Sequence, residues 1–226
     1  MLVLSRTPAF AATTQITQDQ PARKQTQDQV NPQLFKHSLS GLYGIESFKL
    51  NVNQPYNNFK QLYSQSLIAQ KELETICQST ALLSNAQPLF SGVKSKQRAQ
   101  EKIRLDLNGD NRKITDIARA TILAHDIDGL VTAYENLNKQ TKILGVKNRF
   151  KTPAPSGYRD LNLLVELPDT KIIAEVQLHL SEIEKVKSGP EHDLYEIIQG
   201  IERRASAESR ELNEIETTKI TNLRRE

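Results

Sequence analysis

The chain has a single cysteine among its 226 residues, so it cannot form an intrachain disulfide, and a reducing compartment is its expected environment. It also lacks any stretch that approaches the roughly 20 apolar residues needed to span a bilayer, so no membrane contact is predicted. The opening segment, Met1–Ala12, has no basic leader and is interrupted by Arg6, which argues against a secretory signal. These features exclude disulfide-stabilised scaffolds and helical membrane proteins.

A strong excess of one charge is missing as well, because the formal net charge is only +3. That value is too small to predict nucleic-acid binding, so local clusters of charge have to carry such an argument. Large apolar residues are scarce in 1–52, which is rich in Gln, Thr, Asn and Ser and is therefore predicted to be a flexible polar arm. The pattern predicts one domain over 53–226.

The remaining residues alternate between helical and strand periodicity. Helices are predicted at about 56–83, 92–105, 128–137 and 181–187, with a further helix that carries Leu194 to Ile201 after a break at Ser188-Gly-Pro; strands are predicted at 114–124, 141–150, 157–167 and 171–180. This order predicts an α/β (α+β) domain with a mixed sheet. Helices would cover its apolar face, and its polar face would remain available.

The last two strands are joined by turn-forming residues at 168–170, which predicts an antiparallel hairpin. The simplest register pairs Glu166 with Lys171 and brings Tyr158 opposite His179, about 5 Å apart. Alternation places six chemically varied side chains on one face: Tyr158, Asp160, Asn162, Glu175, Gln177 and His179. Such a surface suits a polar ligand. The alternative is the solvated outer face that antiparallel sheets commonly have.

Basic residues recur before the first of these strands. Lys94, Arg98 and Lys102 are spaced by four, which would align them along one side of a helix. Lys147 and Arg149 add positive charge that strand alternation would direct to a common side. This arrangement can clasp a triphosphate or an RNA backbone. The alternative is a basic helix face that is merely solvated.

Two carboxylates complete the predicted site. Asp116 lies at the start of one strand and Glu175 lies in the middle of another, so neighbouring strands would let them share a divalent ion. Mg²⁺ commonly takes one or two protein carboxylates and fills its other positions with water and phosphate. Phosphoryl-type transfer then requires cations on the phosphates and an oriented hydroxyl. The alternative for Asp116 is a cap or turn residue.

Taken together, these motifs resemble the synthetase domain of RelA/SpoT-type alarmone synthetases over about 90–200. The motifs are Lys94-x3-Arg98-x3-Lys102, Asp116-Ile-Ala, Lys147-Asn-Arg-Phe150, Gly157-Tyr-Arg, Glu175-Val-Gln177 and His192-x-x-Tyr195. The resemblance implies a nucleotidyltransferase-like sheet. It also implies transfer of pyrophosphate from ATP to the 3′ hydroxyl of a guanine nucleotide.

The resemblance further implies a role for individual residues. Lys94, Arg98 and Lys102 would hold the donor phosphates, and Asp116 and Glu175 would bind Mg²⁺. Glu175 would also activate the attacking hydroxyl, while Tyr158 would stack on the acceptor base. Gln177 and His192 would support the acceptor site. The remaining nucleotide-binding candidates are Arg119, Lys147, Arg149, Arg159, Asn162 and His179.

Five positions depart from the family pattern. Arg119 stands where a glycine is usual, and Asp160 stands where a serine is usual. Thr121 stands where an arginine usually follows Asp-Ile-Ala-Gly, Asn162 replaces a histidine, and His179 replaces a second arginine. A variant acceptor, such as the 3′ end of RNA or another nucleotide, is therefore one expectation. The alternative function is a catalytically inactive relative that binds nucleotide or RNA as a sensor. The expected location is the cytoplasm, or a target cell reached as a translocated effector.

Overall fold

The computed structural model describes residues 32–154, 157–187, 197–198, 200–202, 204–206 and 208–223. All of them belong to one unit, Asn31–Glu226. Among these residues no helix is both long enough and apolar enough to cross a membrane. The predicted helix after Ser188 lies largely outside the described residues, and so does the arm before residue 32.

The centre of the domain is a six-stranded sheet in the order β1-β4-β5-β6-β3-β2. The strands are β1 (Phe48–Lys49), β2 (Ala86–Leu89), β3 (Arg119–Ala124), β4 (Lys142–Asn148), β5 (Leu161–Glu166) and β6 (Ile173–Leu180). The pair β3–β6 is parallel, and the other neighbouring pairs are antiparallel. The predicted mixed α/β sheet is confirmed.

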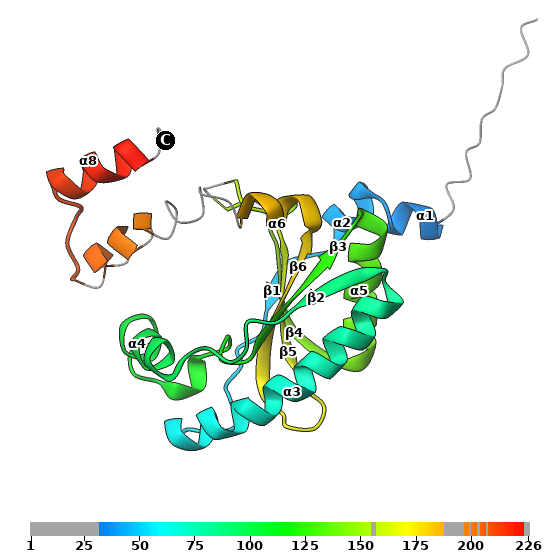
Figure 1. The fold of residues 1–226 in the computed structure, drawn as a ribbon, viewed down its shortest axis with the longest axis horizontal. Coiled ribbons are helices and arrows are strands. Elements are labelled where there is room, and N and C mark those ends of the chain that lie inside the picture. Colours follow the sequence, from blue (N-terminus) through cyan, green and yellow to red (C-terminus); the bar gives the residue numbers. More distant parts are fainter. Residues whose placement is uncertain are drawn as a thin grey trace, which may run out of the picture. The chain divides into compact units, whose positions relative to one another are not determined.

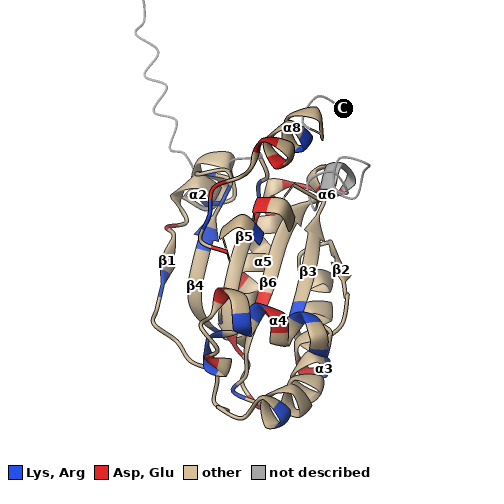
Figure 2. Ribbon diagram, turned by 90° about the vertical axis from the view of Figure 1, so that its left-hand side faces the viewer, with Lys and Arg blue, Asp and Glu red and all other residues tan. Residues whose placement is uncertain are grey.

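The described helices lie on both sides of this sheet. They are α1 (Pro32–Lys36), α2 (Leu39–Gly44), α3 (Phe59–Leu83), α4 (Lys96–Asp106), α5 (Ile127–Gln140), α6 (Ser181–Lys187) and α8 (Glu214–Leu223), with a 3₁₀ turn at Asn111–Lys113. The long helix α3 and the helix α5 cover one face, and α4 lies on the other side (Figure 1). Figure 2 shows α4 in front of the strands and α5 behind them.

The apolar core forms between the sheet and the pair α3 and α5. In α3, buried Leu62, Ala69, Leu73 and Cys77 follow the three- and four-residue spacing of one helix face. Asn58 caps the helix by accepting the amide of Gln61 at 3.1 Å. Burial in this core, with a smaller effect of Glu74, raises the pKa of the Cys77 thiol to about 12. Cys77 is therefore a core residue, as its position on the apolar stripe predicts.

The hairpin β5–β6 forms as predicted, but its register differs by two residues. Glu166 pairs with Ile173 rather than with Lys171. The turn is longer because Lys171 adopts a left-handed conformation with φ 58°. Glu72 of α3 fixes it by accepting the backbone amides of Asp169 and Thr170 at 2.7 and 3.1 Å. A shift of two leaves every side chain on its predicted face.

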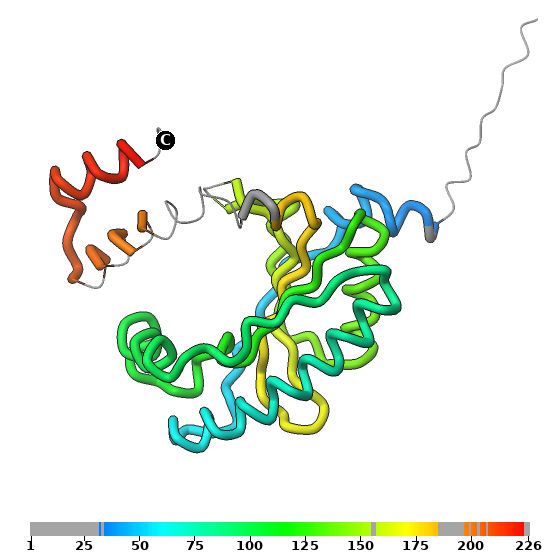
Figure 3. The backbone as a smooth tube through the Cα atoms, in the orientation of Figure 1, coloured from blue at the N-terminus to red at the C-terminus, as the bar shows by residue number. Residues whose placement is uncertain are grey.

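Residues 32–52 depart from the predicted arm. They form α1, α2 and β1, and β1 pairs with β4 at the sheet edge. Few apolar groups are needed because the side-chain amide of Asn148 donates to the carbonyls of Leu42 and Ile45 at 2.7 and 2.9 Å. Gln54 continues the attachment by donating to the carbonyls of Ile114 and Ile173. The path of this segment along the sheet can be followed in Figure 3.

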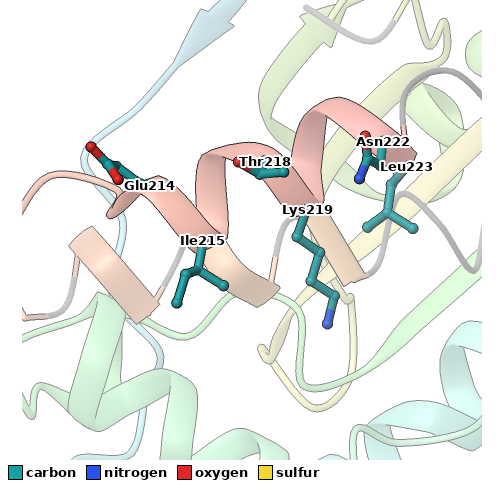
Figure 4. Close-up of a pocket in the computed structure, with 6 residues that line it drawn as sticks. All are labelled: Glu214, Ile215, Thr218, Lys219, Asn222 and Leu223. Atoms are coloured by element: carbon teal, nitrogen blue, oxygen red, sulfur yellow. The ribbon is translucent and has the colours of Figure 1, made fainter.

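Two hollows lie away from the polar face of the sheet. One, of about 500 Å³, is lined by α8 alone through Glu214, Ile215, Thr218, Lys219, Asn222 and Leu223 (Figure 4). The other, of about 620 Å³, lies between the segment 49–52 and residues 106–115. Neither is lined by a predicted site residue.

Candidate functional site

The polar face of the sheet carries side chains that the strand registers align in rows. One row crosses four strands: Lys147 on β4, Asn162 on β5, Gln177 on β6 and Thr121 on β3. The next row holds Leu164, Glu175 and Arg119. Because paired residues direct their side chains to the same face, these rows form one platform. This face lies on the side of α4, away from α3 and α5 (Figure 1).

Two lysines meet one carboxylate beside this platform. Lys102 of α4 donates to Asp116 Oδ2 at 2.8 Å, and the Nζ of Lys94 lies 3.1 Å from the same oxygen. The predicted single helical row of Lys94, Arg98 and Lys102 is wrong, because α4 begins at Lys96 after the cap Ser95. Lys94 instead lies in the preceding loop, where its amide donates to the carbonyl of Ile117 at 2.9 Å. Arg98 lies exposed on the first turn of α4.

Arg119 brings a third positive charge to this group. Burial of the Lys94 ammonium lowers its pKa; Asp116 acts in the opposite direction, but Arg119 and Lys102 lower it further. The pKa of Asp116 is also lowered: burial would raise it, but Lys102 and Lys94 more than offset that effect. We call Lys94, Lys102, Asp116 and Arg119 the donor cluster. It holds three cations and one anion, so it has a surplus of positive charge.

The donor cluster also has polar atoms without partners. Among the described residues, Asp116 Oδ1 and Arg119 Nε are buried and accept or donate no hydrogen bond. The backbone of Arg119 is held on both sides by the side-chain amide of Gln70 at 3.0 and 3.1 Å. Buried polar atoms are rarely left unpaired in native proteins. Both atoms are therefore available to a ligand; Glu135 Oε1 on α5, the third such atom, pairs with Lys36.

Glu175 adjoins the donor cluster through the backbone. Its amide donates to the carbonyl of Ala118 at 3.1 Å, two residues after Asp116. Gln177 donates its side-chain amide to Glu175 Oε1 at 3.0 Å and so restricts the carboxylate. Within the part of the chain that the structure describes, no three His, Cys, Asp or Glu side chains gather to hold a metal.

A second cluster surrounds Tyr158. Its hydroxyl lies 3.0 Å from Asp160 Oδ2 and 2.6 Å from His179 Nε2, and Arg149 donates to Asp160 Oδ1 at 2.6 Å. His179 Nδ1 lies 2.7 Å from Glu184 of α6. Asp160 and His179 are completely buried. We call Arg149, Tyr158, Asp160, His179 and Glu184 the tyrosine network.

The ring of Tyr158 is constrained from two directions. The guanidinium carbon of Arg149 lies 5.7 Å from the ring centroid, and the His179 ring meets it edge-on at 5.6 Å. Burial raises the pKa of Tyr158, and Asp160 raises it further, so the hydroxyl stays protonated. Burial lowers the pKa of Arg149, but Asp160, Tyr158 and Glu175 more than offset it. Arg149 therefore links the tyrosine network electrostatically to Glu175.

The other predicted residues have varied positions. Asn162 is buried opposite Gln177, and Lys147 is exposed. Arg159 donates to the carbonyl of Phe150 at 2.7 Å, which gives it a structural contact. His192 lies outside the described residues. Glu184 was not predicted, although an acidic residue in the first turn of a helix that follows the strand of His179 was a usable signal.

No protein-family model matches the chain. The (p)ppApp synthetase toxin Tas1 of Pseudomonas aeruginosa (strain UCBPP-PA14) is 25% identical over 142 residues, which cover 63% of this chain and 31% of Tas1. The chain thus matches about a third of the length of this curated relative.

Solved structures show similarity over more of the chain. The crystal structure of the type VI effector Tas1 with its immunity protein matches with a TM-score of 0.51 and 22% identity, covering 74% of this chain and 97% of that chain. The domain has a RelA/SpoT-like synthetase fold. Small alarmone synthetase 2 from Bacillus subtilis gives a TM-score of 0.49 and 20% identity over 71% of this chain and 90% of that chain. The RelA/SpoT-like fold confirms the resemblance that the motifs predict.

Proposed function

We propose that the domain transfers pyrophosphate from ATP to a hydroxyl group of a purine nucleotide. The observation that carries this proposal is the donor cluster, in which Lys94 and Lys102 share the carboxylate of Asp116 and Arg119 adds a third positive charge near Lys94. A partly buried surplus of positive charge is unfavourable unless an anion compensates it. The triphosphate of ATP is such an anion, and ATP is the pyrophosphate donor that the resemblance to RelA/SpoT-type synthetases implies.

Thr121 does not remove the positive charge that the family pattern places on β3. Arg119 and Thr121 are two residues apart, so their side chains share one face of the strand. Arg119 can therefore contact phosphate from a position one step along the same face. Its buried Nε, unpaired among the described residues, is available for that contact. Arg98 on the exposed turn of α4 would reach the outer phosphate oxygens.

The carboxylates fit a Mg²⁺ ion that is shared with substrate. The orphaned Oδ1 of Asp116 is an oxygen ligand of the kind that Mg²⁺ prefers, and Glu175 would supply the second carboxylate. Two carboxylates suffice when phosphate and water complete the coordination. When bound, the ion would neutralise charge that develops on the transferred phosphates.

Glu175 would act as the general base. Gln177 holds its carboxylate by one oxygen, which leaves the group oriented across the platform. In the reaction, Glu175 accepts the proton of the acceptor hydroxyl, the oxygen bonds to the β-phosphorus of ATP, and the bond to the α-phosphate breaks to release AMP. Lys94, Lys102 and Arg119 bind the phosphate oxygens throughout. Tyr158 would stack on the acceptor base.

We favour an adenine nucleotide as acceptor because Tas1 is named a (p)ppApp synthetase. Guanine nucleotides and RNA are the other acceptors to compare. The same relative is a type VI effector in its solved complex. A toxin that is translocated into a target cell is therefore the biological role we propose.

The test supplies ATP labelled at its β and γ phosphates together with Mg²⁺ and, separately, adenine nucleotides, guanine nucleotides or bulk tRNA. We expect label on the adenine nucleotide, and we expect Glu175→Gln to reduce the rate by at least about 100-fold, as for loss of a general base. Glu101→Gln, on the exposed side of α4, is the matched control. Absence of label on every acceptor would refute the transfer.

A second candidate is an inactive relative that binds nucleotide as a sensor. Asp160 and His179 favour it. Both stand at positions where the family pattern has other residues, and both are buried in contacts with the hydroxyl of Tyr158. The same labelling experiment separates the two functions. Saturable binding of ATP with no labelled product would support the sensor.

A further inference from the structure

The tyrosine network has a defined direction of hydrogen bonding. Tyr158 has one hydroxyl proton, and its oxygen lies within bonding distance of both Asp160 and His179. The carboxylate of Asp160 can only accept, so the hydroxyl donates to it, and His179 Nε2 then donates to the hydroxyl. His179 Nδ1 faces the carboxylate of Glu184, which also accepts. Both ring nitrogens of His179 therefore donate.

This direction balances the charges of the network. Arg149 and the doubly protonated His179 carry two positive charges, and Asp160 and Glu184 carry two negative ones. Buried charges are tolerated where they are paired and hydrogen-bonded, and removal of one member leaves its partner exposed to the full desolvation penalty. The five side chains consequently hold one another in a single arrangement. The ring of Tyr158 is the member whose orientation they fix.

The hydroxyl of Tyr158 is occupied by protein partners, which limits how the ring can recognise a ligand. With its oxygen used by Asp160 and His179, the residue offers a partly exposed aromatic surface rather than a hydrogen bond. Arg149 lies against the ring and adds a positive charge to that surface. Bases stack on aromatic rings without regard to their hydrogen-bonding edges. A ring fixed in this way is preorganised for stacking.

We propose that Asp160, His179 and Glu184 are positioning residues that hold Tyr158 for stacking on the acceptor base. This inference rests on the proposed function, because it assigns Tyr158 to the acceptor. It predicts that weakening the network raises the KM of the acceptor and leaves the KM of ATP unchanged. Glu184 acts at the far end of the network, through His179, and makes no contact with Tyr158 in the described hydrogen bonds.

The test measures acceptor KM, ATP KM and kcat for Tyr158→Phe, Glu184→Ala and Glu184→Gln. Tyr158→Phe keeps the ring but removes its anchor, and we expect the acceptor KM to rise roughly fivefold, the effect of one lost hydrogen bond. Glu184→Ala should give a similar rise, and Glu184→Gln, which still accepts from His179, should restore most of it. Tyr134→Phe, on α5 behind the sheet, is the matched control and should match the wild type.

Equilibrium binding of the acceptor to the same proteins separates this inference from the proposed function. If the wild type transfers pyrophosphate but the variants keep the acceptor KM within about twofold, the positioning role is refuted and the transferase stands. If the wild type transfers nothing yet binds the nucleotide more tightly than Tyr158→Phe, positioning stands and the transferase is refuted. Equal rises in the KM of ATP and acceptor would indicate a general structural defect and would also refute positioning.

Discussion

The donor cluster and the tyrosine network lie on one face of the same sheet but follow opposite electrostatic rules. The donor cluster has three cations for one carboxylate, and it holds buried atoms that lack partners among the described residues. The tyrosine network has two positive and two negative groups, joined from Arg149 to Glu184 by hydrogen bonds. The described charges of the donor cluster leave a positive surplus, whereas those of the tyrosine network form hydrogen-bonded pairs.

This difference indicates how the two substrates are recognised. The surplus of positive charge in the donor cluster lowers the free energy of unfolding of the free protein, and bound phosphate relieves that cost. The donor cluster therefore favours phosphate binding at the expense of folding stability. A balanced network gains its stability on folding, so the tyrosine ring is already in place when a base arrives. Substitutions in the donor cluster should therefore mainly change the affinity for ATP, and substitutions in the tyrosine network should mainly change the free energy of unfolding.

Asp160→Asn should destabilise the domain by about 3 kcal/mol, because breaking a buried ion pair leaves the partner charge uncompensated. Arg149 would lose its charged partner, and because asparagine has one acceptor oxygen, either Arg149 or Tyr158 would face an NH2 group in place of an acceptor. The matched control is Asp110→Asn, which removes a solvent-accessible carboxylate beside Arg112 and should lower the free energy of unfolding much less. Urea unfolding monitored by circular dichroism measures both. Equal losses in the free energy of unfolding of the two variants would contradict a stabilising role of the tyrosine network.

Lys94→Met should separate binding from stability in the opposite direction. We expect the KM of ATP to rise about tenfold or more, since one charge-assisted contact to phosphate is lost. The unfolding midpoint should stay equal or rise, because burial disfavours the Lys94 ammonium and Lys102 still pairs with Asp116. Lys139→Met, exposed on α5, is the control for removing one positive charge. A fall in the unfolding midpoint with an unchanged KM of ATP would contradict the assignment of the donor cluster to phosphate binding.

The sequence predicts most of the sheet because alternation is a local signal. β5 and β6, the turn between them and the faces of their side chains follow from period two, and the parallel pair β3–β6 places Arg119 beside Glu175. The register is not local. It depends on Glu72, which is about 100 residues distant and binds the turn. Strand β2 was missed because it contains Pro88, which only an edge strand accepts.

The sequence predicts only part of the candidate site, because the rest depends on contacts between residues that are distant in the sequence. Lys102 and Asp116 meet in an ion pair, but the placement of Lys94 depends on where α4 begins. The sequence predicts that Tyr158 lies beside His179, but it does not predict the rest of the tyrosine network. Arg149 follows β4, Asp160 precedes β5 and Glu184 lies on α6, so these side chains meet only after the sheet has formed. Residue type alone suggested a solvated or ligand-binding face for Asp160 and His179. Their complete burial is a tertiary result.

The smallest expected effect is a pH dependence that belongs to Lys94 alone. Its pKa is lowered on folding from the ordinary 10.5, so between the lowered value and 10.5 the unfolded chain binds more protons than the folded one. Stability of the wild type relative to Lys94→Met should therefore rise with pH through that window, and below the lowered pKa the full penalty should remain. Unfolding midpoints of both proteins over a pH series that ends at 10.5 measure this slope. Pyrophosphate should abolish it, because an anion in the donor cluster restores the charged lysine; a slope that persists with pyrophosphate bound would place the anion elsewhere.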